Sequence, residues 1–299
     1  MNNKIVITGA TGFVGSNLTT FFLNKNYEVY LIVRPNSDLY NLDIKNSKLK
    51  VFKYDNELNS LISFFKEVNP ICTFHLASNF IAEHQPTDID SLVASNISFG
   101  LHLLEAMKEA NVKTLINTGT SWQHYNNDDY NPVCLYAATK QAFESLIEYY
   151  VQAEGFKVIT LKLFDTYGET DRRPKLINFL NKFAKDQSEL NLSPGEQIVN
   201  LVHIHDVCTA YEAAMKLIEK QKSYIHYKYV IKHSKSYTLK EVINVFEKVS
   251  QKKIKIVWGG KPYRKREVMT LWDNGKILPN WSARINLEEG FEKILVKND

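Results

Sequence analysis

The chain has 299 residues, of which 44% are hydrophobic and 23% are charged, and its formal net charge is +4. This composition is typical of a globular protein with a large core and excludes an overall disordered chain. The basic residues are scattered among acidic ones, a pattern that argues against nucleic acid as a partner. The length predicts two lobes, or one large α/β domain with an appended lobe.

Cysteine usage and hydropathy indicate the compartment. The three cysteines, Cys72, Cys134 and Cys208, are far apart in the chain, so they predict neither a disulfide framework nor a zinc site. The first apolar run is too short for a signal peptide, and no run of about 18 apolar residues occurs that could cross a bilayer. We therefore expect a cytoplasmic protein that does not bind membranes.

Short β-branched runs alternate with amphipathic stretches in the first half of the chain. Strands are predicted at residues 5–7, 29–33, 50–54, 71–75, 113–118 and 158–163. Helices are predicted at 13–24, in a stretch ending at 68, at 88–110 and at 136–154. Parallel neighbouring strands need crossover connections, so this alternation predicts an α/β fold with a parallel sheet covered on both faces.

The alternation weakens after about residue 168, and the pattern becomes α+β. Helices are predicted at 175–185, 206–219, from Thr238 onward and near 286–296, and strands at 198–202 and 229–231. Thr238 and Glu241 have the spacing of a capping box, which marks a helix start.

A glycine-rich turn follows the first predicted strand and begins the first helix. It reads Gly9-Ala10-Thr11-Gly12-Phe13-Val14-Gly15. Glycines three apart at such a turn let the backbone approach a pyrophosphate closely, and the helix N-terminus stabilises the phosphate charge. The turn therefore predicts a dinucleotide site, with a tight turn that binds nothing as the alternative.

Tyr136 and Lys140 form a Y-x-x-x-K pair at the start of a predicted helix. Residues four apart lie on one face of a helix, where an ammonium can lower the pKa of a phenol that is otherwise a poor acid at neutral pH. A hydroxyl residue, Thr120, lies at the end of the fifth predicted strand, and Ser121 follows it.

These motifs resemble those of the short-chain dehydrogenase/reductase superfamily, specifically its extended branch, which acts on nucleotide-activated sugars. The resemblance implies that Tyr136 donates a proton to a carbonyl and that Lys140 binds the nicotinamide ribose and tunes the tyrosine. It also implies that Thr120, or Ser121 in its place, hydrogen-bonds the reacting oxygen. Asn96 is either a support for the active-site helix or a surface amide.

In that family the second strand ends in an acidic residue that binds the ribose of NAD, whereas here Val33 stands at this position and Arg34 follows. A guanidinium without a competing carboxylate favours a 2′-phosphate, so NADP(H) is expected and NAD(H) is possible. The resemblance also implies that Asp55 accepts a hydrogen bond from the adenine amine. The alternatives are a solvated Arg34 and a buried capping role for Asp55. The implied cofactor-binding residues are Gly9, Thr11, Gly12, Phe13, Val14, Gly15, Arg34, Asp55, Leu76, Ala77, Thr118, Tyr136 and Lys140.

The absence of certain residues reduces the number of reactions of this family that the chain is expected to catalyse. Sugar-nucleotide dehydratases of this family carry an Asp-Glu pair after the active-site hydroxyl, where this chain has Ser121 and Trp122. Trp122 and Gln123 also do not supply the acid/base couple that inverts ring carbons. The expected reaction is the NADPH-dependent reduction of the C4 ketone of a nucleotide-linked 4-keto-6-deoxysugar, as in surface-polysaccharide reductases of the CDP-abequose synthase type. An NAD-dependent 4-epimerase and a non-catalytic dinucleotide-binding protein are the alternatives.

The substrate contacts depart from the family pattern. Asp165 replaces an Asn that helps to hold the sugar nucleotide, and Val199 replaces a phosphate-binding Arg, so another cation must serve. The expected substrate-binding residues are Thr120, Ser121, Asp165, Arg173 and Arg264. His203 and His205 lack a third ligand, so no metal site is expected.

The resemblance also implies an organisation for the whole chain. Residues 1–165 are expected to form the NAD(P)-binding Rossmann domain, a doubly wound parallel sheet. Residues 166–299 are expected to form a smaller substrate-binding lobe, with segments near 198–235 returning to the first domain. A homodimer is expected through the helices near 88–110 and 136–154.

Overall fold

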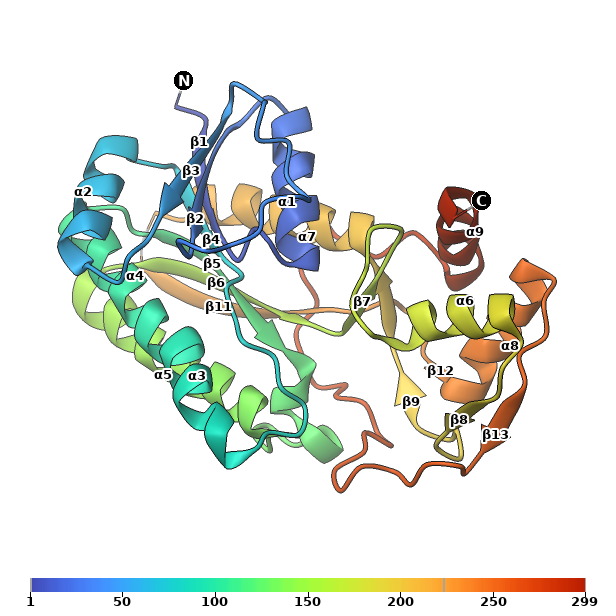
Figure 1. The fold of residues 1–299 in the computed structure, drawn as a ribbon. Helices are drawn as coiled ribbons and strands as arrows, with labels where there is room; N and C mark the ends of the chain where they lie inside the picture. Colours follow the sequence, from blue (N-terminus) through green and yellow to red (C-terminus); the bar gives the residue numbers. More distant parts are fainter. Residues whose placement is uncertain (1, 223, 299) are drawn as a thin grey trace.

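The computed structural model describes residues 2–222 and 224–298. Its centre is a seven-stranded parallel sheet with the strand order β11-β6-β5-β4-β1-β2-β3 (Figure 1). The strands are β1 (Lys4–Thr8), β2 (Glu28–Val33), β3 (Leu49–Lys53), β4 (Cys72–His75), β5 (Thr114–Thr120), β6 (Lys157–Leu163) and β11 (Ile225–Ile231). The α/β fold class of the Rossmann type is confirmed.

Helices cover both faces of this sheet because successive residues of a strand point to opposite sides. Ile5 and Ile7 of β1 belong to a core that includes residues of α1 (Phe13–Asn24) and α7 (Ile204–Glu219). Val6, between them, belongs to a second core on the opposite face. That core is shared with α2 (Leu58–Val68), α4 (Phe99–Glu109) and α5 (Leu135–Glu154).

The helix predicted at 88–110 is interrupted in the structure. It consists of α3 (Ile89–Val93), a π-helical turn (Ala94–Ser98) and α4. The apolar periodicity continues through all three parts, so the sequence pattern did not reveal the π-helical turn. This turn contains Asn96, which is 2% exposed. Such π-helical turns occur frequently at functional sites.

The second half of the chain is α+β, as expected. Its helices are α6 (Leu176–Asp186), α8 (Leu239–Ser250) and α9 (Leu287–Asn298). Short strand pairs accompany them: β7 (Asp165–Tyr167) with β10 (Leu201–His203), β8 (Leu190–Leu192) with β13 (Ile256–Trp258), and β9 (Ile198–Val199) with β12 (Tyr237–Thr238). The strand predicted at 198–202 is thus divided at Asn200, whose side chain donates to the His233 carbonyl at 2.8 Å.

α8 begins at the predicted capping box. The hydroxyl of Thr238 accepts the Glu241 N–H at 3.1 Å, and the Glu241 carboxylate accepts the Thr238 N–H at 2.7 Å. This part of the prediction is confirmed. Within the described part of the chain, no helix is long and apolar enough to span a bilayer.

A long connection, residues 259–286, runs from β13 back along the central sheet to α9 (Figure 1). We call it the return segment. Its Asp273 N–H donates to the Asn127 side chain at 2.7 Å, and its Arg284 N–H donates to the buried Asp206 carboxylate at 2.9 Å. These contacts hold residues from the end of the chain against the carboxyl edge of the central sheet.

Candidate active site

The glycine-rich turn connects β1 to α1 and packs against the turn that follows β4. Gly9 has φ +71°, and a Cβ at this position would lie 2.5 Å from the Ala77 nitrogen. A Cβ at Gly15 would lie 2.2 Å from the Gly9 carbonyl oxygen. Larger residues therefore cannot replace these glycines without moving the backbone. The Thr8 hydroxyl accepts the N–H groups of Leu76 and Ala77, at 3.2 Å each, and so holds the two turns together.

The start of α1 fits the pyrophosphate of a dinucleotide. Gly12 precedes the helix without a side-chain cap, and its first turn contains no acidic residue. The helix therefore presents backbone N–H groups and the positive end of its dipole without a neighbouring carboxylate of its own. Thr11, Phe13 and Val14, which the sequence also predicted as cofactor contacts, belong to this same turn and helix start.

Two predicted contacts to the adenosine end lie at the surface. Arg34 follows β2 and is exposed. Asp55 is exposed as well, and its Oδ1 accepts the Glu57 N–H at 3.2 Å and the Ser60 hydroxyl at 3.1 Å. These hydrogen bonds hold the pKa of Asp55 below its usual value. Asp55 thus makes the contacts of a residue that supports the start of α2, but at the surface and not in the buried position that the alternative gave it. Its contact with the cofactor stays a prediction.

Tyr136 and Lys140 lie one turn apart at the start of α5. Lys140 is 3% exposed, and burial lowers its pKa to about 8, against the opposing effect of the Glu144 carboxylate. Burial raises the pKa of Tyr136 to about 12, while a hydrogen bond with Ser78 lowers it. We expected Lys140 to depress this pKa. In the structure burial outweighs the other influences on the phenol.

Thr120 ends β5 and is held by the short turn that follows, Ser121–Gln123. Its hydroxyl oxygen accepts the Trp122 N–H at 3.2 Å, and its own N–H donates to Gln123 Oε1 at 3.0 Å. The Gln123 amide in turn donates to the Glu144 carboxylate at 3.1 Å. Gln123 therefore connects the strand that carries Thr120 to the helix that carries Tyr136 and Lys140.

Asn96 supports the active-site helix and is not a surface amide. Its Oδ1 accepts the Asn79 N–H at 2.7 Å, and its Nδ2 donates to the Thr139 hydroxyl at 2.9 Å. Thr139 donates to the Tyr136 carbonyl at 2.7 Å. Thr118, predicted to contact the cofactor, has its hydroxyl 2.6 Å from the phenol oxygen of Tyr211.

A buried charged cluster behind Thr120 was missed by sequence reasoning. The Lys162 ammonium lies 2.8 Å from His124 Nε2 and 3.5 Å from the Glu144 carboxylate, which also pairs with Lys228 at 2.9 Å. Burial and the nearby Lys162 lower the pKa of His124 to about 4, so at neutral pH its ring accepts the lysine proton. The signal available in the sequence was the position of Glu144 one turn beyond Lys140 on the same helical face.

A cavity of about 270 Å³ lies between the carboxyl edge of the sheet and α6. Tyr136, Lys140 and Thr120 are not among the residues that line it. Phe80 lines it, and its ring packs edge-on against Tyr136 at 4.9 Å. Trp122 also lines the cavity, and its ring lies 5.5 Å from that of Phe80. Asp165, Val199 and Arg264 complete this part of the wall.

The structure brings together some of the predicted substrate residues and not others. Arg264 lies 5.1 Å from the Trp122 ring and binds the Glu267 carboxylate at 2.6 Å, which raises its pKa. Arg173 instead binds the Asp171 carboxylate and stacks 4.4 Å from the ring of Phe13 in the glycine turn. It is not among the residues that line the cavity. Asp165 and Arg264 therefore share a site that Arg173 does not line.

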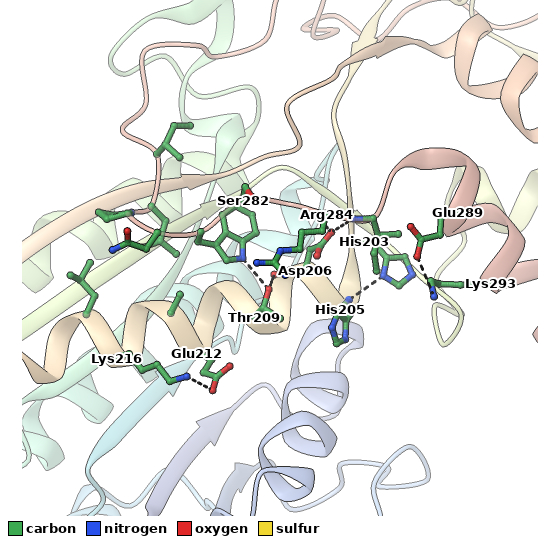
Figure 2. A pocket seen from close by; sticks show the side chains of 18 of the residues that line it. His203, His205, Asp206, Thr209, Glu212, Lys216, Ser282, Arg284, Glu289 and Lys293 are labelled. Carbon is green, nitrogen blue, oxygen red and sulfur yellow. Dashed lines mark hydrogen bonds and ion pairs between the residues drawn. The ribbon is translucent and has the colours of Figure 1, made fainter.

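A larger groove of about 1310 Å³ lies elsewhere, between α7, the end of the return segment and α9 (Figure 2). His203 lies there, 3.3 Å from Glu169, and Glu212 pairs with Lys216 at 2.7 Å. None of the predicted site residues line this groove. Among residues 2–222 and 224–298, no cluster of His, Cys, Asp or Glu could hold a metal ion.

The parallel sheet, its glycine turn and the Tyr136–Lys140 pair define an NAD(P)-dependent enzyme of the extended short-chain dehydrogenase/reductase type. The chain belongs to the NAD-dependent epimerase/dehydratase family, whose sequence profile matches residues 5–229.

Similar proteins include two curated relatives and a solved structure. The chain is 27% identical to a CDP-abequose synthase from Salmonella muenchen, over 99% of this chain and 98% of that protein. It is 28% identical to a CDP-abequose synthase from Yersinia pseudotuberculosis, over 89% of this chain and 90% of that protein. The structure of UDP-glucose 4-epimerase with UDP-glucose from Thermotoga maritima has a TM-score of 0.84 at 20% identity, covering 99% of this chain and 98% of that one.

Proposed function

We propose that this chain uses NADPH to reduce the C4 ketone of a nucleotide-linked 4-keto-6-deoxysugar, in the synthesis of a surface-polysaccharide sugar. The observation that carries the proposal is the composition of the turn after Thr120. The turn after Thr120 contains no carboxylate, and the amide of Gln123 is buried and already bonded to Glu144. This turn therefore lacks the groups for dehydration or inversion of a ring carbon.

The nature of the substrate is inferred from similarity and from the cavity. The two CDP-abequose synthases match this chain along most of its length, which supports a nucleotide-linked sugar as substrate. This cavity combines aromatic walls at Phe80 and Trp122 with a cation at Arg264. Aromatic rings and a guanidinium are suited to a ligand that has a ring and a phosphate group.

The residues of the site have distinct roles in this reaction. A nicotinamide dinucleotide bound at the glycine-rich turn would supply the hydride. Tyr136 donates a proton to the ketone oxygen, which becomes the hydroxyl of the product. Thr120 accepts the Trp122 N–H, so its own hydroxyl hydrogen remains available for the same oxygen. Lys140, whose pKa is about 8, is largely protonated at neutral pH. Its positive charge stabilises the phenolate form of Tyr136 that remains after the proton has been donated.

The preference for NADPH rests on the end of β2. This strand ends at Val33, and the exposed Arg34 follows it. Within the described part of the chain, no ion pair is formed by the Arg34 guanidinium, so this cation is available to the 2′-phosphate that distinguishes NADPH from NADH. NADH is the alternative cofactor.

An NAD-dependent nucleotide-sugar 4-epimerase is the second candidate. The likeness in fold to the UDP-glucose 4-epimerase favours it. An epimerase would interconvert two sugars without net consumption of reduced cofactor, whereas the proposed reductase consumes one NADPH for each ketone. A non-catalytic dinucleotide-binding protein is disfavoured because Tyr136, Lys140 and Thr120 are all present.

The deciding experiment follows the loss of NADPH absorbance with CDP-, dTDP-, GDP- and UDP-linked 4-keto-6-deoxysugars. We expect one of them to be reduced, and Tyr136→Phe to lower the rate by about 100-fold or more while still binding NADPH. Tyr224→Phe, at an exposed position outside α5, is the matched control. Interconversion of UDP-sugars without loss of NADPH would instead identify the epimerase, and an unchanged rate in Tyr136→Phe would exclude this catalytic assignment.

A further inference from the structure

A small chamber that adjoins the cavity of about 270 Å³ is lined by two residues that each carry a buried polar atom without a partner. The chamber has a volume of about 40 Å³. Trp122, Asp165, Val199 and Arg264 line both it and the larger cavity. In the described part of the chain, the indole N–H of Trp272 and the Oε1 atom of Gln197 are buried without a hydrogen-bond partner, and both residues line this chamber.

Neighbouring side chains hold both groups in place. The Trp272 ring stacks on His124 with a centroid distance of 3.6 Å and an interplanar angle of 9°. The Lys162 ammonium also contacts this ring, at 5.3 Å from its centroid. The Gln197 Nε2 donates to the Ser193 hydroxyl at 2.8 Å, which uses the amide nitrogen and leaves Oε1 as the group in need of a donor. Among the described residues that line the chamber, Trp272 and Gln197 are thus the two that keep a buried donor and a buried acceptor without a partner.

We propose that this chamber receives a single hydroxyl group of the substrate's sugar, which accepts from Trp272 and donates to Gln197. This inference rests on the proposed function. A volume of about 40 Å³ accommodates one water-sized group, so a nucleobase or a diphosphate does not fit. A hydroxyl both donates and accepts, whereas an ionised phosphate oxygen or a ketone oxygen only accepts and would leave Gln197 unpaired.

The position of the chamber suits a hydroxyl near the reacting carbon. Ser121 and Trp122, the two residues directly after Thr120, line the chamber. A sugar whose ketone is bonded by Thr120 and Tyr136 would thus place a neighbouring part of its ring toward Trp272. A sugar that lacks this hydroxyl would leave the two buried groups unpaired, so Trp272 and Gln197 determine which sugars bind well.

The test is a comparison of binding constants for stable nucleotide sugars. Calorimetry with UDP-glucose, CDP-glucose and their 2-, 3-, 4- and 6-deoxy derivatives would be carried out in the presence of NADP⁺. We expect one deoxy derivative to bind the wild type about 10-fold more weakly than its parent. Trp272→Phe keeps the ring on His124 but removes the N–H, so it should bind the parent about 10-fold more weakly and lose the discrimination between the two sugars.

Two further variants make the comparison specific. Gln197→Met removes the acceptor at similar size and should have the same effect on discrimination. It also serves as the readout if Trp272→Phe does not fold. Trp258→Phe, in the exposed strand β13, is the matched control and should bind both sugars as the wild type does.

The outcomes separate this inference from the proposed function. If the wild type binds parent and deoxy sugars equally, or if Trp272→Phe keeps the discrimination, the chamber holds only water and the inference is wrong, while the reductase proposal stands. If the wild type binds NADP⁺ but neither UDP-glucose nor CDP-glucose, the inference about the chamber is wrong, while the reductase proposal is decided by the four 4-keto-6-deoxysugars.

Discussion

Lys140 carries a charge that burial in the folded protein disfavours. Its pKa falls from 10.5 to about 8, so at pH 7 the ammonium is charged in both the folded and the unfolded chain but is penalised only in the folded one. The folded state releases its proton at a lower pH than the unfolded state does. The destabilising contribution is therefore fully present below about pH 8 and disappears as the pH rises toward 10.5.

Lys140→Met should therefore stabilise the protein in the absence of cofactor and substrate. We expect its free energy of unfolding at pH 7 to exceed that of the wild type by up to about 3 kcal/mol, from the size of the pKa shift. Urea unfolding between pH 7 and 10.5 measures this, and the difference should shrink across that range. Lys248→Met, at an exposed position on α8, is the control. A variant less stable than the wild type at pH 7 would contradict the burial penalty.

Arg34 provides the test of cofactor preference. Arg34→Ala should weaken NADPH binding by about 10- to 100-fold, because a hydrogen bond to a charged group contributes roughly 1.5–3 kcal/mol. NADH binding should change little, since NADH lacks the 2′-phosphate. Titration of nicotinamide fluorescence gives both constants, with Lys50→Ala on the neighbouring strand β3 as control. If Arg34→Ala weakened the binding of NADPH and NADH equally, Arg34 would not bind the 2′-phosphate.

At the scale of elements, local side-chain contacts determine where helices begin and bend. The π-helical turn before α4 places Asn96 against Asn79 and Thr139, and so couples the turn after β4 to α5. The capping box at Thr238 begins α8, which belongs to the core of the second half of the chain. The π-helical turn and the capping box share no residues or partners, so their effects on stability can be tested independently.

Removal of the cap should affect stability and leave dinucleotide binding unchanged. Thr238→Ala removes the acceptor for the Glu241 N–H, which costs about 1 kcal/mol of the free energy of unfolding. Thermal and urea unfolding measure the loss, and NADPH titration measures binding. Ser145→Ala, an exposed hydroxyl within α5, should be close to neutral. If the two variants were equally stable, the capping box would contribute nothing measurable.

At the scale of the whole molecule, the helices expected to form a dimer lie together on one face. α3 and α4 both contact α5. Val93 on α3 is 42% exposed and Tyr149 on α5 is 61% exposed, so apolar groups remain uncovered there. We predict a homodimer through this face.

Light scattering coupled to gel filtration should give twice the mass of one chain. The double variant Val93→Glu/Tyr149→Glu should shift this mass toward that of a monomer, because two charges would be buried in the interface. Tyr40→Glu, at an exposed position outside α3, α4 and α5, is the control. A monomeric wild type would contradict the predicted assembly.

The assignment of cofactor binding to residues 1–165 and substrate binding to 166–299 stays a prediction. The expected boundary falls within β7, while β11 joins the first sheet.

The sequence by itself determined the features that depend on near neighbours in the chain. The glycine turn, the capping box and the spacing of Tyr136 and Lys140 all arise within a few residues, and the alternation of strands and helices was sufficient for the fold class. The roles of the individual site residues stay predictions. The positions of the site residues in the chain follow from these short spacings. The structure accordingly places the glycine turn at the start of α1 and the Tyr136–Lys140 pair at the start of α5.

Only the tertiary structure decided the features that depend on segments far apart. The return segment brings Trp272 onto His124, and three separate elements supply Gln123, Glu144 and Lys162 to one buried cluster. The pKa of Tyr136 rises because packing removes water from the phenol, an effect that no spacing reveals. Burial is the sum of many distant contacts, whereas a motif records only local ones, so the charge state and surroundings of the site required the folded chain.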